Sequence, residues 1–150
     1  MIFIGMAKII ISERQYKLIT KHVEESIDPN EAYNNESAMQ TVLNGRRGVA
    51  FLVAYHDKSR QLIERAKEMG LNVISMPQKG GSFKGSVANV VYRNGYEEEA
   101  QRLFNIVRKN NGFLPIKTPE ETYEIGILLD YNPEKVKEFV LKNFPNFKFY

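Results

Sequence analysis

The stretch that decides the fold is GVAFLVAYHDKSRQLIERAKEMGLNVISM, residues 48–76. It opens with eight apolar and aromatic residues, Gly48–Tyr55, a run typical of a strand that is covered on both faces. Asp57 or Ser59 can cap the amphipathic helix that follows, which a glycine ends. Leu71–Met76 predicts a second strand. A connection of about fifteen residues is the length that a right-handed parallel crossover needs, so the stretch predicts a β-α-β unit.

Further elements flank this unit on both sides. Val87–Tyr92 predicts a third strand, reached through a loop too short for a crossover, so we expect it to run antiparallel. An Asn-Gly turn then leads into a helix over Glu97–Lys109. Toward the N-terminus, Ile9–Ile11 predicts a short strand, a capping box predicts a helix from Glu13, and a shorter helix is expected at about Glu36–Leu43.

The C-terminal part of the chain predicts two helices in sequence. Thr118 combines a capping box with a following proline, and Asn132–Pro133 repeats the same start signal. We therefore expect an α/β (or α+β) fold, with a small mixed sheet of three to four strands that contains one β-α-β unit, flanking helices and a C-terminal helical hairpin. One globular domain is expected over 1–150, with an α/β core at 1–112 and the hairpin of 113–150 packed on it.

Composition excludes several classes of site. The chain has 150 residues and no cysteine, so it has no disulfide, no thiolate zinc site and no cysteine nucleophile. Histidine ligands are limited to His22 and His56, and we expect neither a metal nor a cofactor. The apolar N-terminus carries Gly5 and Lys8 and is neither a membrane span nor a signal peptide. These features predict a cytoplasmic protein without a membrane partner.

Positive charge is concentrated in the middle of the chain. Residues 41–94 hold nine basic and three acidic side chains, a balance of +6, whereas residues 1–40 have a balance of −2 and residues 95–150 a balance of −1. The same part contains PQKGGSFKGS, residues 77–86, which joins glycine freedom to two lysines. Such a loop can present backbone N–H groups and cations to an anion. We therefore expect an anionic ligand in this region.

Two parallel strands end at the same edge of a sheet, where α/β proteins usually bind ligands. The residues after the first strand and the loop after the second strand should therefore lie close together, near a helix N-terminus that favours anions. We expect the ligand-binding set to be His56, Asp57, Lys58, Arg60, Lys79, Gly80, Gly81, Ser82, Lys84, Gly85 and Ser86. The alternative is that Asp57 only caps its helix and the glycines only serve loop geometry. Arg46, Arg47 and Arg93 should gather at the opposite edge as a second basic cluster, or as solvated turn residues.

Catalytic patterns are poor in this sequence, and no catalytic residue is assigned. His56 with Asp57 could polarise a water or accept a proton. No serine lies in a nucleophile-elbow pattern, and glutamates such as Glu97 and Glu120 fall at helix starts, where the helix dipole explains them. Whether the protein is an enzyme stays open, and a non-enzymatic function is preferred.

One local segment resembles a known motif. In EIGILLDYNPEKVKEFV, residues 124–140, Gly126 takes a small-residue position, and Asn132 caps a second helix that carries Val136. The segment, within about residues 118–143, resembles the helix-turn-helix of many transcription factors. The resemblance implies that 133–143 enters the major groove of DNA. The other interpretation is a plain helical hairpin that closes the core.

The preferred hypothesis is a small basic protein that binds a phosphate-bearing ligand, either a nucleotide-like small molecule or a nucleic-acid backbone. One alternative is DNA binding through the C-terminal hairpin. Another is an interaction or assembly role, in which the aromatic tail FPNFKFY, residues 144–150, packs on the domain or on a partner and supports a homo-oligomer. The composition would also suit a viral or accessory gene.

Overall fold

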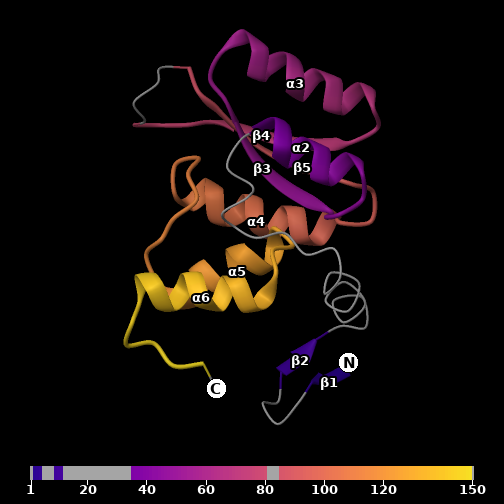
Figure 1. The fold of residues 1–150 in the computed structure, drawn as a ribbon. Helices are drawn as coiled ribbons and strands as arrows, with labels where there is room; N and C mark the ends of the chain where they lie inside the picture. Colours follow the sequence, from indigo (N-terminus) through magenta and orange to yellow (C-terminus); the bar gives the residue numbers. More distant parts are fainter. Residues whose placement is uncertain (1, 5–8, 12–34, 81–84, 150) are drawn as a thin grey trace.

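The computed structural model describes residues 2–4, 9–11, 35–80 and 85–149. Its elements in chain order (Figure 1) are β1 (Ile2–Ile4), β2 (Ile9–Ile11), α2 (Asn35–Leu43), β3 (Val49–Ala54), α3 (Asp57–Glu68), β4 (Asn72–Pro77), β5 (Val87–Tyr92), α4 (Glu97–Lys109), α5 (Pro119–Leu128) and α6 (Pro133–Asn143). The expected strand at Ile9–Ile11 is confirmed and pairs antiparallel with β1, which was not predicted. The helix predicted from Glu13 lies outside the described residues.

The three-stranded sheet has the order β3-β5-β4, and β5 pairs antiparallel with both neighbours. Because β3 and β4 are both antiparallel to β5, they run in the same direction, as the β-α-β prediction requires. They are not adjacent, however, since β5 lies between them. The expected α+β class with flanking helices and a C-terminal hairpin is confirmed, but the three-stranded sheet is antiparallel throughout and not mixed as predicted. The β-α-β unit is split by the strand that follows it.

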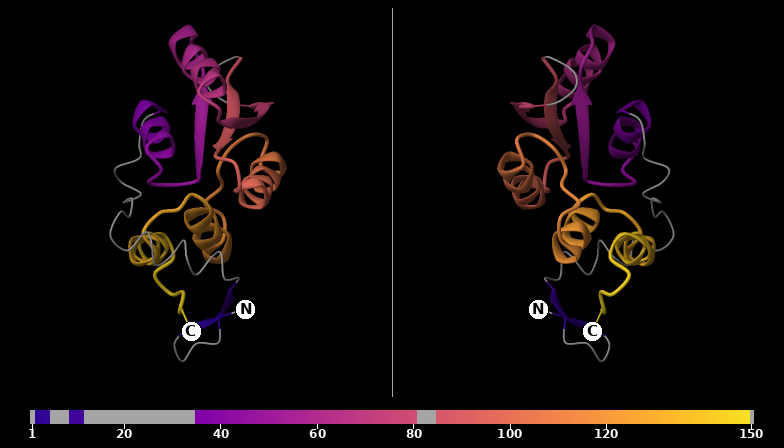
Figure 2. Two further views of the ribbon diagram at one scale, coloured as in Figure 1. Left: turned by 90° about the vertical axis from the view of Figure 1, so that its right-hand side faces the viewer. Right: turned by 90° about the vertical axis from the view of Figure 1, so that its left-hand side faces the viewer.

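Helices cover both faces of this sheet, which explains the continuous apolar run in β3. In Figure 2, α2 and α4 lie on opposite sides of the sheet in both views. The α2–α3 face buries Ala38, Met39, Val42, Ala50, Leu52, Ala54, Ile63, Ala66 and Val91. The α4–α5 face buries Val49, Val90, Ala100, Leu103, Ile106, Ile125, Leu128 and Leu129. Successive β3 residues thus alternate between two cores.

The C-terminal helices form the expected hairpin. Thr118 Oγ1 accepts the Glu121 N–H at 3.2 Å, and Asn132 Oδ1 accepts the Glu134 N–H at 2.9 Å, so both predicted caps are confirmed. Gly126 allows α5 and α6 to approach closely, because a Cβ at this position would lie 2.5 Å from Val136 Cγ1. Among the described residues, every helix is too short or too polar to span a bilayer.

The aromatic tail packs back on this hairpin. The Phe149 ring lies 5.4 Å from the Tyr123 ring of α5 and 4.9 Å from the Phe147 ring, centroid to centroid. Lys137 Nζ of α6 stands 5.8 Å from the centre of the Phe149 ring. These contacts give the tail an intramolecular partner. Self-association through the tail stays a prediction.

Candidate functional site

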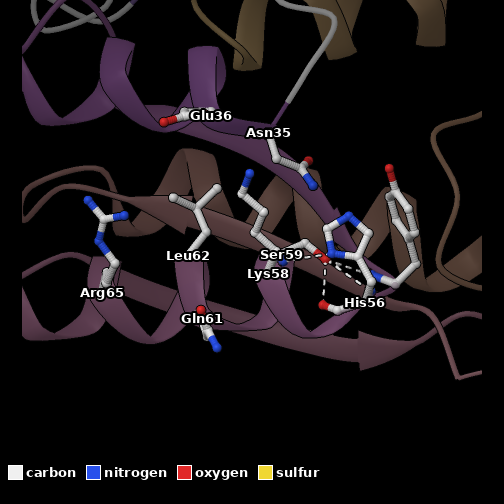
Figure 3. Close-up of a pocket in the computed structure, with 9 residues that line it drawn as sticks. Asn35, Glu36, His56, Lys58, Ser59, Gln61, Leu62 and Arg65 are labelled. Atoms are coloured by element: carbon white, nitrogen blue, oxygen red, sulfur yellow. Dashed lines mark hydrogen bonds between the residues drawn. The ribbon is translucent and has the colours of Figure 1, made fainter.

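A pocket of about 430 Å³ lies between α2 and α3, and we call it the α2–α3 pocket. It is lined by Asn35, Glu36, Tyr55, His56, Lys58, Ser59, Gln61, Leu62 and Arg65 (Figure 3). Residues 58, 61, 62 and 65 recur at helical spacing and so share one side of α3. Asn35 and Glu36 come from the first turn of α2. This volume falls within the range typical of small-molecule sites.

His56 holds the N-terminus of α3, where the sequence suggested Asp57 or Ser59 as the cap. The Ser59 N–H donates to His56 Nδ1 at 3.0 Å, and the His56 N–H donates to Ser59 Oγ at 3.1 Å, forming a capping box. Ser59 Oγ also accepts the Tyr55 N–H at 3.0 Å and donates to the His56 carbonyl at 2.9 Å. Histidine was missed because it is not among the residues usually preferred at this position.

This cap fixes the chemistry that His56 offers to the pocket. Because Nδ1 accepts a backbone N–H, the neutral imidazole carries its hydrogen on Nε2. Figure 3 shows that the ring nitrogen away from Ser59 points toward Asn35. His56 therefore presents a donor to a bound molecule, and the earlier suggestion that it accepts a proton does not suit this arrangement. Asp57 is exposed and pairs with Arg60 at 3.5 Å instead.

Charged and aromatic groups complete the α2–α3 pocket. Lys58 extends from α3 toward α2 beside Asn35 in Figure 3, while Glu36 and Arg65 lie farther along the same opening. Asn35 is held in place because its Nδ2 donates to the Val53 carbonyl at 2.8 Å. Tyr55 is 45% exposed, and its ring stands 4.5 Å from the His56 ring in a T-shaped arrangement. The pocket thus combines two cations, one carboxylate, hydrogen-bond donors and an aromatic ring.

The buried Ser59 hydroxyl is expected to set the position of His56. Ser59→Ala removes two accepted hydrogen bonds and one donated bond, and should lower the free energy of unfolding by about 1 to 2 kcal/mol. Urea denaturation measures this change. Glu68→Ala, at the exposed C-terminal end of the same helix, is the control and should change stability by less than about 0.5 kcal/mol. Equal effects in the two variants would contradict the role given to Ser59.

The structure brings only part of the predicted ligand set together. His56 and Lys58 line the α2–α3 pocket, whereas Arg60 lies on another side of α3, where its Nη2 contacts the Gly85 carbonyl at 3.5 Å. Lys79 donates its N–H to the Asn111 carbonyl at 2.9 Å. Gly80 is exposed with φ 80°, and Ser86 is buried. Gly81, Ser82 and Lys84 lie outside the described residues.

The second basic cluster is incomplete at the opposite edge of the sheet. Arg93 lies against Gly45, since a Cβ built there would stand 2.6 Å from Arg93 Nη1, and Arg46 follows in the chain. Arg47 does not join them in solvent, because it is only 1% exposed. Its Nε donates to Thr41 Oγ1 at 2.7 Å and its Nη1 to the Leu129 carbonyl at 3.3 Å. Arg47 therefore ties the start of β3 to the α5–α6 turn.

Two smaller cavities lie elsewhere on the described surface. One of about 200 Å³ between α5 and α6 is mainly apolar and includes Ile116, Leu129 and Phe139. Another of about 200 Å³ lies between α3 and the sheet, and we call it the α3 notch. It is lined by Ala54, Arg60, Ile63, Glu64, Lys67, Ser75, Val87 and Asn89. Among the described residues, no group of three His, Cys, Asp or Glu side chains could hold a metal ion.

Comparison with known proteins gives a fold and no family. No protein-family model matches the sequence, and no curated protein matches it. Among solved structures, the chain is similar to the crystal structure of the bacterial cysteine methyltransferase effector NleE. The similarity has a TM-score of 0.62 and 19% sequence identity, and it covers 89% of this chain and 78% of that chain. At this identity, the likeness is one of fold.

The predicted function as a binder of nucleotides or nucleic acid is wrong, because the comparison relates nine-tenths of the chain to the fold of an enzyme-like effector. The local geometry explains the error. His56 and Ser59 already occupy backbone N–H groups at the start of α3, and Asp57 adds negative charge at the expected anion site. Lys58 and Arg60 lie on different sides of the helix.

The alternative of DNA binding through the C-terminal hairpin is wrong for the same reason. The resemblance to a helix-turn-helix came from the small residue Gly126 and the capped α6. In the structure, Gly126 serves close packing against Val136, and the acidic Glu134 and Glu138 are exposed on α6. They pair with Lys137 at 3.6 Å and with Lys135 at 3.4 Å, respectively, and so offset positive charge that a DNA-binding helix relies on.

Proposed function

We propose that this protein is an effector-like methyltransferase that modifies a cysteine of another protein, with the α2–α3 pocket as its active site. The fold likeness to a cysteine methyltransferase effector is the observation that carries the proposal. The pocket adds support, because it gathers donors and charges at the end of β3. We also retain a cytoplasmic location as a prediction.

Methylation of a cysteine requires its thiolate, and nearby cations lower the pKa of a thiol. Lys58 and the Nε2–H of His56 are suited to stabilise the thiolate of an incoming cysteine, since both are directed into the pocket (Figure 3). The thiolate forms a new S–C bond to the methyl group as the donor's S–C bond breaks, and the thiol proton leaves to solvent. Ser59 acts as a positioning residue by fixing the His56 ring.

The side chains that line the pocket are complementary to the charged groups of a sulfonium methyl donor. Such a donor supplies an electrophilic methyl group when bound. A sulfonium amino acid carries a cationic sulfur, an ammonium group and a carboxylate. The Glu36 carboxylate and the exposed Tyr55 ring can receive cationic groups, and the Arg65 guanidinium can receive a carboxylate.

The proposal is tested with tritium-labelled S-adenosylmethionine and a mixture of reduced proteins that carry free thiols. We expect label to enter protein, and blocking the thiols with iodoacetamide beforehand to prevent it. Lys58→Ala should lower the labelling rate at least tenfold, because it removes the cation that stabilises the thiolate. Lys142→Ala, an exposed lysine on α6, is the matched control and should stay within twofold of the unchanged protein.

Calorimetric titration with S-adenosylmethionine supplies an independent measurement. We expect binding to the unchanged protein and weaker binding to Glu36→Gln, which retains the shape of the side chain but loses its charge. If the protein neither binds the donor nor labels any thiol, the proposed function is rejected. Labelling that survives the iodoacetamide treatment would reject cysteine as the acceptor.

A further inference from the structure

The exposed edge of β4 is a second feature through which this protein can hold a polypeptide. β4 pairs with β5 on one side only. Its sequence, NVISMP over residues 72–77, has no charged side chain. Uncharged edge strands readily accept another strand, and proteins usually protect them with charges, prolines or bulges. Here the only such protection within the strand is Pro77 at its end.

The register defines which backbone groups face outward. The Gln78 N–H donates to the Ser86 carbonyl at 2.9 Å, in continuation of the Pro77–Val87 pair. Antiparallel ladders alternate bonded and non-bonded pairs. Asn72, Ile74 and Met76 therefore direct their N–H and C=O groups to β5, and residues 73, 75 and 77 direct theirs to the open edge.

The other edge of the sheet supports this assignment. The Arg93 N–H donates to the Gly48 carbonyl at 2.9 Å, so the same alternation turns the Val53 carbonyl away from β5. Asn35 Nδ2 donates to that carbonyl at 2.8 Å, as the alternation requires. The β3 edge thus receives a side-chain hydrogen bond from α2. On the β4 edge, no described residue outside the sheet bonds the backbone of Val73 or Ser75.

The α3 notch reaches the β4 edge at Ser75 and can receive a side chain there. Ser75 is exposed, and its hydroxyl donates to Asn89 Oδ1 at 2.6 Å on the sheet face that α3 covers. Arg60 and Lys67 line the notch from α3 together with Glu64. Lys67 pairs with Glu64 at 3.1 Å and Arg60 pairs with Asp57 at 3.5 Å. Such exposed pairs contribute little, so both cations can turn to an incoming carboxylate. Main-chain pairing with an adjacent side-chain pocket is the arrangement by which sheet edges bind extended peptides with specificity.

From these observations we infer that β4 binds an extended, acidic segment of a partner protein as an added strand. The inference rests on the proposed function in taking this partner to be the protein that is modified. The strand would bond to the N–H and C=O groups of Val73 and Ser75, and Pro77, which has no N–H, would end the ladder. A residue beside Ser75 would place a carboxylate near Arg60 and Lys67. Lys79 adds positive charge beyond Pro77.

A second copy of this chain fits the edge less well. Antiparallel pairing of two β4 strands about Ile74 would set one α3 notch against the other. Each notch holds Arg60, Lys67 and one carboxylate, Glu64, so two surfaces with an excess of positive charge would face each other, and like charges oppose association. An acidic segment meets the same cations with favourable charge. The charge of the notch therefore selects a different polypeptide over self-pairing.

The test uses the full chain, no methyl donor, and an eight-residue capped peptide in which valine alternates with glutamate. We expect the peptide to slow hydrogen exchange at the Val73 and Ser75 amides and to leave Ile74 and Met76 unchanged, because the latter already bond to β5. Ser75→Pro removes an outward N–H and should weaken peptide binding at least tenfold by fluorescence anisotropy. Ser75→Ala loses only the hydroxyl and should bind within about fivefold of the unchanged protein.

A peptide N-methylated at every second residue gives the same test without changing the protein, should Ser75→Pro fail to fold. It should bind at least tenfold more weakly. Each of three results would overturn the inference. The N-methylated peptide could bind as tightly as the unmodified peptide, or a peptide with lysine in place of glutamate could do so. The third result is unchanged hydrogen exchange at the Val73 and Ser75 amides. A dimer seen by sedimentation in the unchanged protein and lost in Ser75→Pro would overturn it in favour of a second copy.

The two proposals fail separately, because peptide binding is measured without a methyl donor. If the peptide protects β4 but no methyl transfer is detected, the proposed enzymatic function is rejected and the β4 edge remains a binding surface. If methyl transfer is detected but the peptide does not protect β4, only the inference about the β4 edge is rejected.

Discussion

Replacing Arg47 by methionine is expected to lower the free energy of unfolding by about 3 to 5 kcal/mol, because it leaves buried partners uncompensated. Arg47 is 1% exposed and donates to Thr41 Oγ1 and to the Leu129 carbonyl. Burial lowers the pKa of Arg47, and the neighbouring Tyr131 and Asp130 act in the opposite direction. Tyr131 also packs its ring 5.4 Å from the guanidinium carbon. Chemical denaturation measures the loss.

Two companion variants decide whether this loss comes from the uncompensated charge. Arg46→Met changes the preceding, partly exposed arginine and should alter stability by less than about 0.5 kcal/mol. Arg47→Met combined with Asp130→Asn should recover part of the loss, since it removes the charge left behind. Asn also tolerates the φ of 59° at position 130 and can still accept the Gly48 N–H. If Arg47→Met lowers the free energy of unfolding no more than Arg46→Met does, the stabilising role assigned to the buried Arg47 is wrong.

Gly48→Ala is expected to destabilise the protein by about 3 kcal/mol, since overpacking a filled core forces side chains or backbone to move. Gly48 is buried, and a Cβ at this position would overlap the ring of Tyr96. The Gly48 N–H donates to Asp130 Oδ2 at 2.7 Å, and its carbonyl accepts the Arg93 N–H at 2.9 Å, so the backbone cannot shift without breaking these bonds. Thermal or urea unfolding measures the effect.

A double-mutant cycle with Tyr96→Ala isolates the steric contact. Tyr96→Ala opens the space that the new methyl group needs, so Gly48→Ala should cost at most about 1 kcal/mol in that background. An undiminished cost in the Tyr96→Ala background would show that the ring is not the cause.

Local signals in the sequence were sufficient to predict most of the described helices and strands. β5 and α4 have the predicted bounds, because a turn or an acidic helix start marks their ends. The caps at Thr118 and Asn132 placed α5 and α6. The order of the strands could not be derived in this way. Whether β4 or β5 lies next to β3 depends on packing between segments that are distant in the chain, and the apolar pattern of each strand is compatible with either order.

The candidate site was less predictable than the fold. His56 and Lys58 follow a strand, and this position pointed to the end of β3 where the α2–α3 pocket lies. Arg65 shares the helical face of Lys58 and could have been found from its spacing. Asn35 and Glu36 could not, because no local signal fixes how α2 docks beside α3. The positive charge of the middle segment suggested phosphate, although part of it is used internally, as Arg47 shows.

The position of β5 between β3 and β4 has a consequence for how the chain is made. Because β5 separates β3 from β4, these two strands form no sheet bond with each other, and the sheet cannot be completed until the ribosome has supplied residue 92. Thirty-eight residues separate Ala54 from Tyr92, which corresponds to roughly two to eight seconds of translation. During this interval, α2 and α3 are the described helices that can shelter the apolar residues of β3. The nascent protein therefore depends on helices such as these, or on a chaperone, to avoid aggregation.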